Sequence, residues 1–319
     1  MNCRISVVIP TYKRIALLQR CLRAVQDQSY SASEIIIADD GCDSRVMLLV
    51  KSSEQRVPLR YVPVPDSKGP AAARNAGVKV ATGDLVAFTD DDCVPDGDWL
   101  KAAAMEFLKS GIEAAWGRVC VPFAGIPTDY QRNESQLCVA GFVTANCFCK
   151  RSVFWQVGGF DENYTAAWRE DSDLYLSLLK SGVRMKFLSA AMVNHPIRRA
   201  SWGISLLQQR KSMFNALLYK RHKQHYTSLI RPAWPWRYYA IVSLFMACAA
   251  LTILGAATGA QICFMLWAAA TLDFAQSRLR DTQYTIAHVA EVLLTSIAIP
   301  FLSLFWRAYG AFRFRVAFI

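Results

Sequence analysis

The chain has 319 residues, a formal net charge of +11 and a hydrophobic fraction of 53%. These values fit one folded domain with a membrane-attached tail. Ten cysteines are scattered along the chain and no second Cys or His pair stands at zinc spacing, which argues against a zinc site and predicts reduced thiols. The opening residues lack the uninterrupted apolar core of a secretory signal.

Short β-branched runs alternate with helix-patterned segments through the first 120 residues. Residues 5–9 and 34–38 predict buried parallel strands, and the apolar positions between them recur at helical spacing. The alternation continues through the segments 59–64, 71–81, 85–88, 96–109 and 114–119. This pattern predicts a doubly wound α/β domain whose ligand lies beyond the carboxyl ends of the strands.

Polar side chains follow three of these predicted strands: Thr11, Tyr12, Asp39, Asp40, Asp90, Asp91 and Asp92. On an extended backbone, residues i and i+2 point the same way. Asp90 and Asp92 can therefore face one Mg²⁺ or Mn²⁺ while Asp91 turns aside. The alternative is a set of solvated turn carboxylates that cap a helix beginning near Asp96.

Residues 69–77 read Gly-Pro-Ala-Ala-Ala-Arg-Asn-Ala-Gly, and their small side chains predict a helix packed closely on the sheet. Arg74 would lie near the crevice as a cation for phosphate. The glycine spacing fits neither the dinucleotide fingerprint nor a Walker loop. Ordinary helix packing is the alternative interpretation.

Six ordered segments in about the first 200 residues resemble the family 2 glycosyltransferases with the GT-A fold: 8–14, 39–41, 69–77, 88–92, 158–162 and 170–171. The resemblance implies inverting transfer from a nucleotide-sugar donor with a divalent metal, Mn²⁺ or Mg²⁺. It implies that Asp92 is a metal ligand. The nucleotide site that we assign on this basis comprises Thr11, Tyr12, Arg14, Asp39, Asp40, Arg74, Asp90 and Asp91.

Glu170 and Asp171 stand at the head of a segment with helical apolar spacing. Acidic residues in a first helical turn commonly serve only as dipole or capping groups. The resemblance instead implies that Asp171 is the general base, which takes the proton from the acceptor hydroxyl in a single displacement. Trp168 and Glu170 are assigned to the acceptor region.

His195 precedes Pro196 after a predicted strand. It fits a structural turn residue, but the resemblance implies a further metal ligand, and imidazole is acceptable to Mn²⁺. Gln208-Gln209-Arg210 occupies the place of a glutamine-rich motif that ends in Arg-Trp in processive relatives. Lys211 stands here instead of Trp, so processive polymerisation is not expected.

No charged residue occurs from 238 to 272, a run longer than the roughly 20 residues that one membrane span needs. Small residues in its middle predict a hairpin of two transmembrane helices, near 238–256 and 260–275. The segment near 286–306 contains Glu291 and Pro300, which favours an interfacial or re-entrant helix. Two helices buried in a soluble core are the alternative.

We therefore predict a GT-A domain over 1–230 and a membrane-associated tail over 231–319, with the catalytic domain on the cytoplasmic side of the inner membrane. The expected partners are a nucleotide-sugar donor, a lipid or lipid-linked glycan acceptor and the membrane. Sugar transfer to polyprenyl phosphate and a catalytically silent sugar-nucleotide-binding scaffold are alternatives. The basic stretch 198–237 leads into the apolar run, so we expect a juxtamembrane helix and no nucleic acid.

Overall fold

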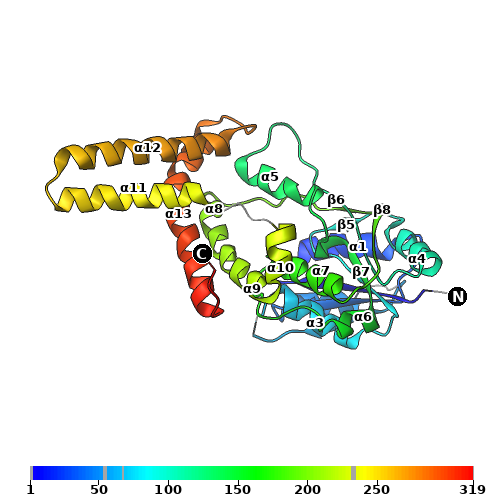
Figure 1. The fold of residues 1–319 in the computed structure, drawn as a ribbon. Helices are drawn as coiled ribbons and strands as arrows, with labels where there is room; N and C mark the ends of the chain where they lie inside the picture. The colour runs from blue at the N-terminus through cyan, green and yellow to red at the C-terminus, as the bar shows by residue number, and fades with distance from the viewer. Residues whose placement is uncertain (1–2, 53–55, 67, 231–234, 319) are drawn as a thin grey trace. The chain divides into compact units, whose positions relative to one another are not determined.

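The computed structural model describes residues 3–52, 56–66, 68–230 and 235–318 (Figure 1). The chain forms two compact units. The first unit comprises Met1–Pro122 and Ser135–Ile197, and the second comprises Phe123–Glu134 and Arg198–Ile319. Each unit therefore contains two separate stretches of the sequence.

The first unit is built on one mixed sheet with the strand order β3-β2-β1-β4-β7-β6-β8-β5. Its strands are β1 (Ile5–Thr11), β2 (Glu34–Asp39), β3 (Leu59–Pro63), β4 (Leu85–Phe88), β5 (Val94–Pro95), β6 (Ala114–Cys120), β7 (Cys147–Lys150) and β8 (Met185–Asn194). The first four strands in this order run parallel, and β6 and β8 also pair in parallel. Strand β7 is antiparallel to β4 and β6, and β5 is antiparallel to β8.

Helices cover both faces of the sheet (Figure 1). They are α1 (Ile15–Gln26), α2 (Ser44–Ser52), α3 (Pro70–Val80), α4 (Trp99–Ser110), α6 (Arg151–Gln156) and α7 (Glu170–Lys180), with 3₁₀ turns η1 (Ser135–Cys138) and η2 (Thr144–Asn146). Successive strand residues point to opposite faces. Val7 belongs to the core that contains Leu18 of α1 and Trp99 of α4. Val8 faces α3, where a Cβ on Gly77 would lie 2.5 Å from Val8 Cγ1.

The alternating pattern of the sequence correctly predicted the α/β class and the strands and helices that it named in the first unit. Strand β1 extends to Thr11, two residues past the predicted run, and α4 begins at Trp99 rather than near Asp96. Helix α2 and strand β5 were not predicted. Strand β5 has only 2 residues, too few to show a period.

The second unit is helical. Its elements are α5 (Asp129–Glu134), α8 (Ile204–Gln208), the 3₁₀ turn η3 (Gln209–Met213), α9 (Phe214–Arg221), α10 (Lys223–His225), the π-helical turn η4 (Tyr226–Ile230), α11 (Trp236–Ile253), α12 (Ala257–Leu279) and α13 (Ile286–Arg313). Helices α11 and α12 lie side by side as an antiparallel pair (Figure 1). Helix α13 packs on α12, α9 and η3, and a Cβ on Gly310 would lie 2.3 Å from the carbonyl oxygen of Met213.

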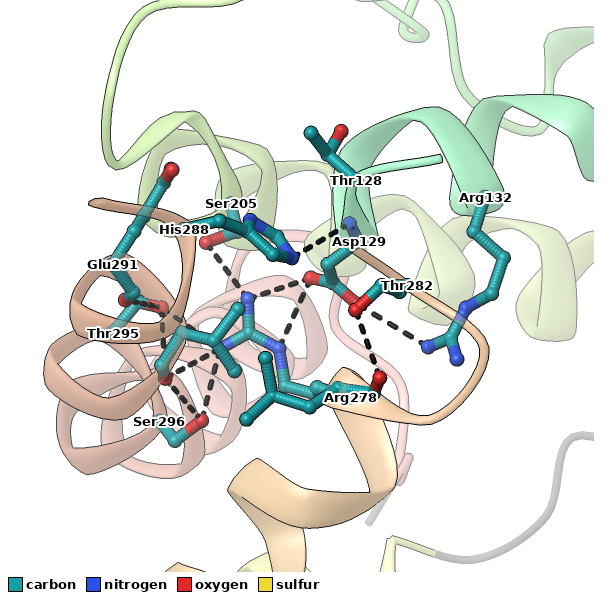
Figure 2. A network of polar contacts seen from close by, with 12 residues as sticks. Thr128, Asp129, Arg132, Ser205, Arg278, Thr282, His288, Glu291, Thr295 and Ser296 are labelled. Carbon is teal, nitrogen blue, oxygen red and sulfur yellow. Dashed lines mark hydrogen bonds and ion pairs between the residues drawn. The ribbon is translucent and has the colours of Figure 1, made fainter. Parts of the chain in front are cut away.

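A polar network fastens α5 to α12 and α13 within the second unit (Figure 2). Arg278 is buried and donates to Asp129 Oδ2, with 2.7 Å between Nη2 and the oxygen. Its Nη1 also donates to Thr295 Oγ1 at 2.8 Å and to Ser296 Oγ at 3.0 Å. His288 Nε2 accepts a hydrogen bond from the backbone N–H of Asp129 at 3.3 Å. The guanidinium is therefore held by partners from two separate parts of the chain.

By length and composition, α11 and α13 are the two helices in the described part of the chain that could cross a membrane. Of the residues of α11, all of which are described, only Ile241 is buried. Helices occupy the three tail segments in which the sequence predicted them. The boundary predicted near residue 230 falls inside the second unit, and residue 231 lies outside the described residues.

Candidate active site

The carboxyl ends of β1, β2 and β4 meet at one edge of the sheet. The parallel register places Thr11 of β1 opposite Asp39 of β2, and Val8 opposite Phe88 at the end of β4. The backbone N–H of Asp40 donates to the carbonyl oxygen of Thr11 at 2.9 Å. The polar residues that follow these strands therefore converge, as the sequence predicted.

Asp91 turns into the protein and ties β4 to β1. Its carboxylate is fully buried and accepts a hydrogen bond from Thr11 Oγ1 at 2.7 Å. Arg14 Nε lies 3.2 Å from the same oxygen. Burial raises the pKa of Asp91 to about 6, although Arg14 and Thr11 act in the opposite direction. Of the residues assigned to the nucleotide, Thr11 and Arg14 thus both contact Asp91.

Four potential metal ligands gather at the ends of β4 and β8: Asp90, Asp92, Cys93 and His195, whose ligand atoms all lie within 4.8 Å of one another. His195 Nε2 lies 3.6 Å from Asp92 Oδ1. The backbone N–H of His195 donates to Cys120 O at 2.7 Å, which fixes the residue at the end of β8.

The chemistry of this donor set fits Mn²⁺ or Mg²⁺. Carboxylate oxygens are the preferred ligands of these cations, and imidazole is acceptable to Mn²⁺. Burial raises the pKa of the Cys93 thiol well above its usual range, and nearby Asp90 and Asp92 raise it further. A thiol binds metal as its thiolate, so Cys93 contributes less than the other three.

Arg74 bridges the metal-ligand cluster and α7. Its side chain is buried, its Nη2 donates to Asp90 Oδ1 at 2.6 Å, and its Nη1 donates to Glu170 Oε1 at 3.3 Å. The guanidinium also lies 5.5 Å from the ring centroid of Phe160. The sequence interpretation made Arg74 a cation for phosphate, and it did not foresee this bridge between two carboxylates.

The neighbouring Asn75 holds the loop that precedes α7. Its Nδ2 donates to the carbonyl oxygen of Phe160 at 2.8 Å and to Glu162 Oε1 at 3.0 Å, and its Oδ1 accepts from the Phe160 N–H at 3.0 Å. Gly159 lies against this amide with a φ of +67°, and a Cβ there would be 2.9 Å from Asn75 Oδ1. The segments 69–77 and 158–162 were both recognised in the sequence. Their contact was not predicted.

Glu170 and Asp171 begin α7, and the two carboxyl groups differ in exposure. Glu170 is buried against Arg74, and burial together with the charge of Asp171 raises its pKa to about 7. Asp171 is only partly buried and accepts a hydrogen bond from the backbone N–H of Ser172 at 2.6 Å. Burial raises the pKa of Asp171 as well. Of the two, Asp171 is the carboxylate that solvent reaches.

Asp39 and Asp40 shape the turn after β2. Asp39 accepts hydrogen bonds from the backbone N–H groups of Gly41, at 2.9 Å, and Asp43, at 2.7 Å. Asp40 Oδ2 accepts from the N–H of Gly69 at 3.0 Å, immediately before α3. Both carboxylates therefore fix backbone segments, after β2 and before α3, in the region where the nucleotide base was predicted.

Two aromatic side chains from the predicted site remain exposed. Tyr12 lies beneath Lys13, with 5.2 Å from Nζ to the ring centroid, and Trp168 lies beneath Arg169 at 5.1 Å. Exposed aromatic faces of this kind can stack on a nucleotide base or a sugar ring. A separate hollow of about 370 Å³ is lined by residues 117–122, Cys138, Ala140 and Phe187, and none of the predicted site residues lines it.

Two family models match the chain. The model described as Glycosyl transferase family 2 matches residues 6–165, and the model described as Glycosyl transferase family group 2 matches residues 125–275. The first covers half of the chain and includes β1, β2, β4 and the aspartates that follow them.

Curated relatives share this part of the sequence. Validoxylamine A glucosyltransferase from Streptomyces hygroscopicus subsp. jinggangensis is 26% identical over 246 residues, covering 65% of this chain and 56% of that protein. Glycosyltransferase AglE from Haloferax volcanii is 29% identical over 168 residues, covering 49% of this chain and 55% of that protein. The chain thus spans about half the length of these relatives.

Solved structures share the fold. The mannosyltransferase PcManGT from Pyrobaculum calidifontis, in complex with GDP-Man and Mn²⁺, has a TM-score of 0.53 at 18% identity and covers 98% of this chain and 85% of that one. S. aureus TarS 1–349 in complex with UDP-GlcNAc has a TM-score of 0.52 at 15% identity and covers 96% of this chain and 92% of that one. These similarities establish the predicted GT-A fold class.

Proposed function

The chain belongs to glycosyl transferase family 2, and we propose that it transfers a sugar, with inversion, from a nucleotide-sugar donor to a lipid or lipid-linked glycan at the cytoplasmic face of a membrane. The observation that carries this proposal is the cluster of Asp90, Asp92 and His195 at the carboxyl ends of β4 and β8. A donor diphosphate held there would lie in the crevice of a doubly wound sheet, which is where such folds bind ligands.

We assign the nucleotide to the ends of β1 and β2. Tyr12 offers an exposed ring on which the base would stack. The turn that Asp39 and Asp40 hold would form the polar edge of the base site. Asp91 supports Thr11 at the end of β1 by accepting its hydroxyl hydrogen bond, and Arg14 in turn lies 3.2 Å from the same Asp91 oxygen. The part of the nucleotide that reaches Asp92 is then its diphosphate.

We assign the general base to Asp171. It is the partly exposed member of the acidic pair, whereas Glu170 is buried against Arg74. Desolvation raises the pKa of Asp171, and a more basic carboxylate accepts the proton of an acceptor hydroxyl more readily. Trp168, three residues earlier and exposed, is placed to contact the acceptor. A single base of this kind suffices for one displacement, which inverts the anomeric configuration.

Asp92, His195 and Asp90 would hold the divalent cation, which when bound supplies positive charge against the negative charge growing on the departing diphosphate. Arg74 neutralises part of the charge of Asp90, since their atoms are 2.6 Å apart. Its second contact fixes Glu170, and with it the first turn of α7 that carries Asp171. Arg74 is thus a positioning residue in this proposal.

The proposed class of acceptor, a lipid or lipid-linked glycan, is inferred from the apolar helices of the second unit. All side chains of helix α11 except that of Ile241 are at least partly exposed, and its exposed residues include Phe245, Met246 and Ile253. Apolar surface of this extent requires lipid or another apolar cover. A domain anchored at a membrane meets lipid-borne acceptors at high local concentration.

The donor can be tested by the thermal stability of the full chain in detergent, measured with a panel of sugar nucleotides in Mn²⁺ or in chelator. Ligand that binds the folded state raises the apparent melting temperature. We expect a rise with one class of sugar nucleotide, and only when Mn²⁺ is present. If no sugar nucleotide stabilises the protein in Mn²⁺, the proposed donor site is wrong.

A further inference from the structure

The antiparallel pair formed by α11 and α12 has a charged base and an uncharged tip. At the base, Arg237 Nη2 lies 3.1 Å from Asp273 Oδ2, and Arg278 pairs with Asp129 at 2.7 Å. Trp236 is exposed beside the first of these pairs. From residue 238 to residue 272 the sequence contains no charge. Charged and aromatic residues at one end of an apolar hairpin mark the level of the lipid headgroups.

The two arms of the hairpin have the same length. One arm runs from Arg237 to Ile253 and the other from Ala257 to Asp273, and an α-helix rises 1.5 Å per residue, so each arm is about 24 Å long. The hydrocarbon core of a bilayer is about 30 Å thick. Each arm is at the lower limit of the lengths that can span a bilayer, and with the Arg237–Asp273 pair at headgroup level the tip ends about 6 Å short of the far edge of a hydrocarbon core of average thickness.

Most side chains of the tip are apolar, and Thr252 and Gln261 are exposed polar side chains in the adjoining helical turns. Ile253 and Leu254 are 85% and 78% exposed in the structure. In the turn that follows, residues 255–259, Thr258 carries the single polar side chain. Turns that face water are rich in Asn, Asp and Ser. The apolar composition of this turn instead favours contact with lipid acyl chains.

The backbone of the tip forms its own hydrogen bonds. Gly255, with a φ of +73°, donates to the carbonyl oxygen of Thr252 at 3.2 Å, and Ala256 donates to that of Leu251 at 2.9 Å. Thr252 Oγ1 donates to Cys248 O at 2.8 Å. Lipid offers no water to backbone polar groups, so a turn within it must satisfy them internally.

We propose that the α11–α12 hairpin is a re-entrant anchor, which enters the membrane from the side of its charged base and ends within the hydrocarbon without reaching the opposite surface. This inference rests on the proposed membrane attachment, and it replaces the two full crossings expected from the sequence. Lipid acyl chains cover the exposed surface of α11 and α12. Segment 123–134 then lies on the side of entry, because Asp129 is paired with Arg278 at the base.

The test uses Thr258→Cys in the full chain and a membrane-impermeant maleimide. Labelling is measured in intact cells and in inverted inner-membrane vesicles, each with and without detergent, and the labelled positions are identified by peptide mass spectrometry. Cys42 and Cys138 are exposed in the first unit and report access from the cytoplasmic side. Ala256→Cys provides a second exposed position in the same turn.

We expect both tip positions to be labelled only after detergent is added, while Cys42 and Cys138 are labelled in inverted vesicles without it. Labelling of the tip in intact cells without detergent would show a full crossing, so the re-entrant anchor would be wrong and membrane attachment would stand. Labelling of the tip in inverted vesicles, at the rate of Cys42, would place the hairpin in water and overturn the membrane attachment itself.

Discussion

Arg74 and Glu170, separated by 96 positions in the sequence, form a buried ion pair with 3.3 Å between Nη1 and Oε1. Because the second Nη of Arg74 is bonded to Asp90, one guanidinium links the proposed metal site to the helix that carries the proposed base. We therefore expect Arg74 to affect both stability and catalysis.

Arg74→Gln should destabilise the first unit by roughly 3–5 kcal/mol, since it leaves the buried Glu170 carboxylate without a counter-charge. Chemical denaturation in detergent measures the loss. The matched control is Arg4→Gln, whose partner Asp84 is also exposed, and its unfolding midpoint should stay nearly unchanged. Equal midpoints for the two variants would show that the Arg74 bridge contributes no stability.

Asp92→Asn should remove most Mn²⁺-dependent donor binding and nearly all transfer, because a neutral amide is a poorer ligand than a carboxylate for a hard cation. Mn²⁺ titration of donor binding by isothermal calorimetry measures this. Asp98→Asn, at an exposed carboxylate before α4, is the control and should behave as the parent. Unchanged Mn²⁺ dependence in Asp92→Asn would exclude Asp92 as a ligand.

His195→Ala should weaken Mn²⁺ affinity less than Asp92→Asn does, since it removes a neutral ligand and leaves the two carboxylates in place. The same titration compares the two variants, with His225→Ala in the second unit as the control. A titration identical to that of the parent would show that His195 is not a metal ligand and has only a structural role at the end of β8.

Asp171→Asn should lower kcat by about 10²- to 10⁴-fold while donor and metal affinity stay close to those of the parent, because only the proton acceptor is lost. Single-turnover transfer and donor titration separate the two effects. A phosphate acceptor is already ionised and needs no base, so full activity of this variant would favour polyprenyl phosphate as the acceptor.

The pH dependence of kcat follows from the same carboxyl group. A base must be ionised, so kcat should fall as the pH falls through the pKa of Asp171, and burial places that pKa above the usual range of an aspartate. The adjacent Glu170 has a pKa raised to about 7, so the acidic limb of the pH profile belongs to the pair of carboxyl groups. A kcat profile flat down to the usual aspartate range would contradict the assignment.

The sequence predicted the fold of the first unit well because hydrophobic periodicity is a local signal. It also predicted that the polar ends of β1, β2 and β4 meet, since parallel strands align their carboxyl ends. It did not predict the contacts of Arg74 or Asn75 with loops more than 80 residues away, because these contacts depend on where α7 and its preceding loop pack. The residue type of Arg74 or Asn75 does not by itself show which distant residue the side chain contacts.

The division of the chain was harder to predict for a related reason. A composition change near residue 231 suggested a boundary there, but α9 packs on α13, with Phe214 and Phe314 ring centroids 6.3 Å apart. The segment 123–134 is short and polar, so its pattern did not indicate that it belongs with the apolar helices. Contacts such as the pairing of Asp129 with Arg278 and the hydrogen bond of the Asp129 N–H to His288 make that membership visible.

The discontinuous second unit sets a rule for exchanging the proposed membrane anchor between enzymes of this kind. A chimaera that replaces residues 198–319 alone would remove Arg278 and leave Asp129 without this ion-pair partner. The exchanged part therefore has to include both stretches, 123–134 and 198–319, transferred together from the same protein.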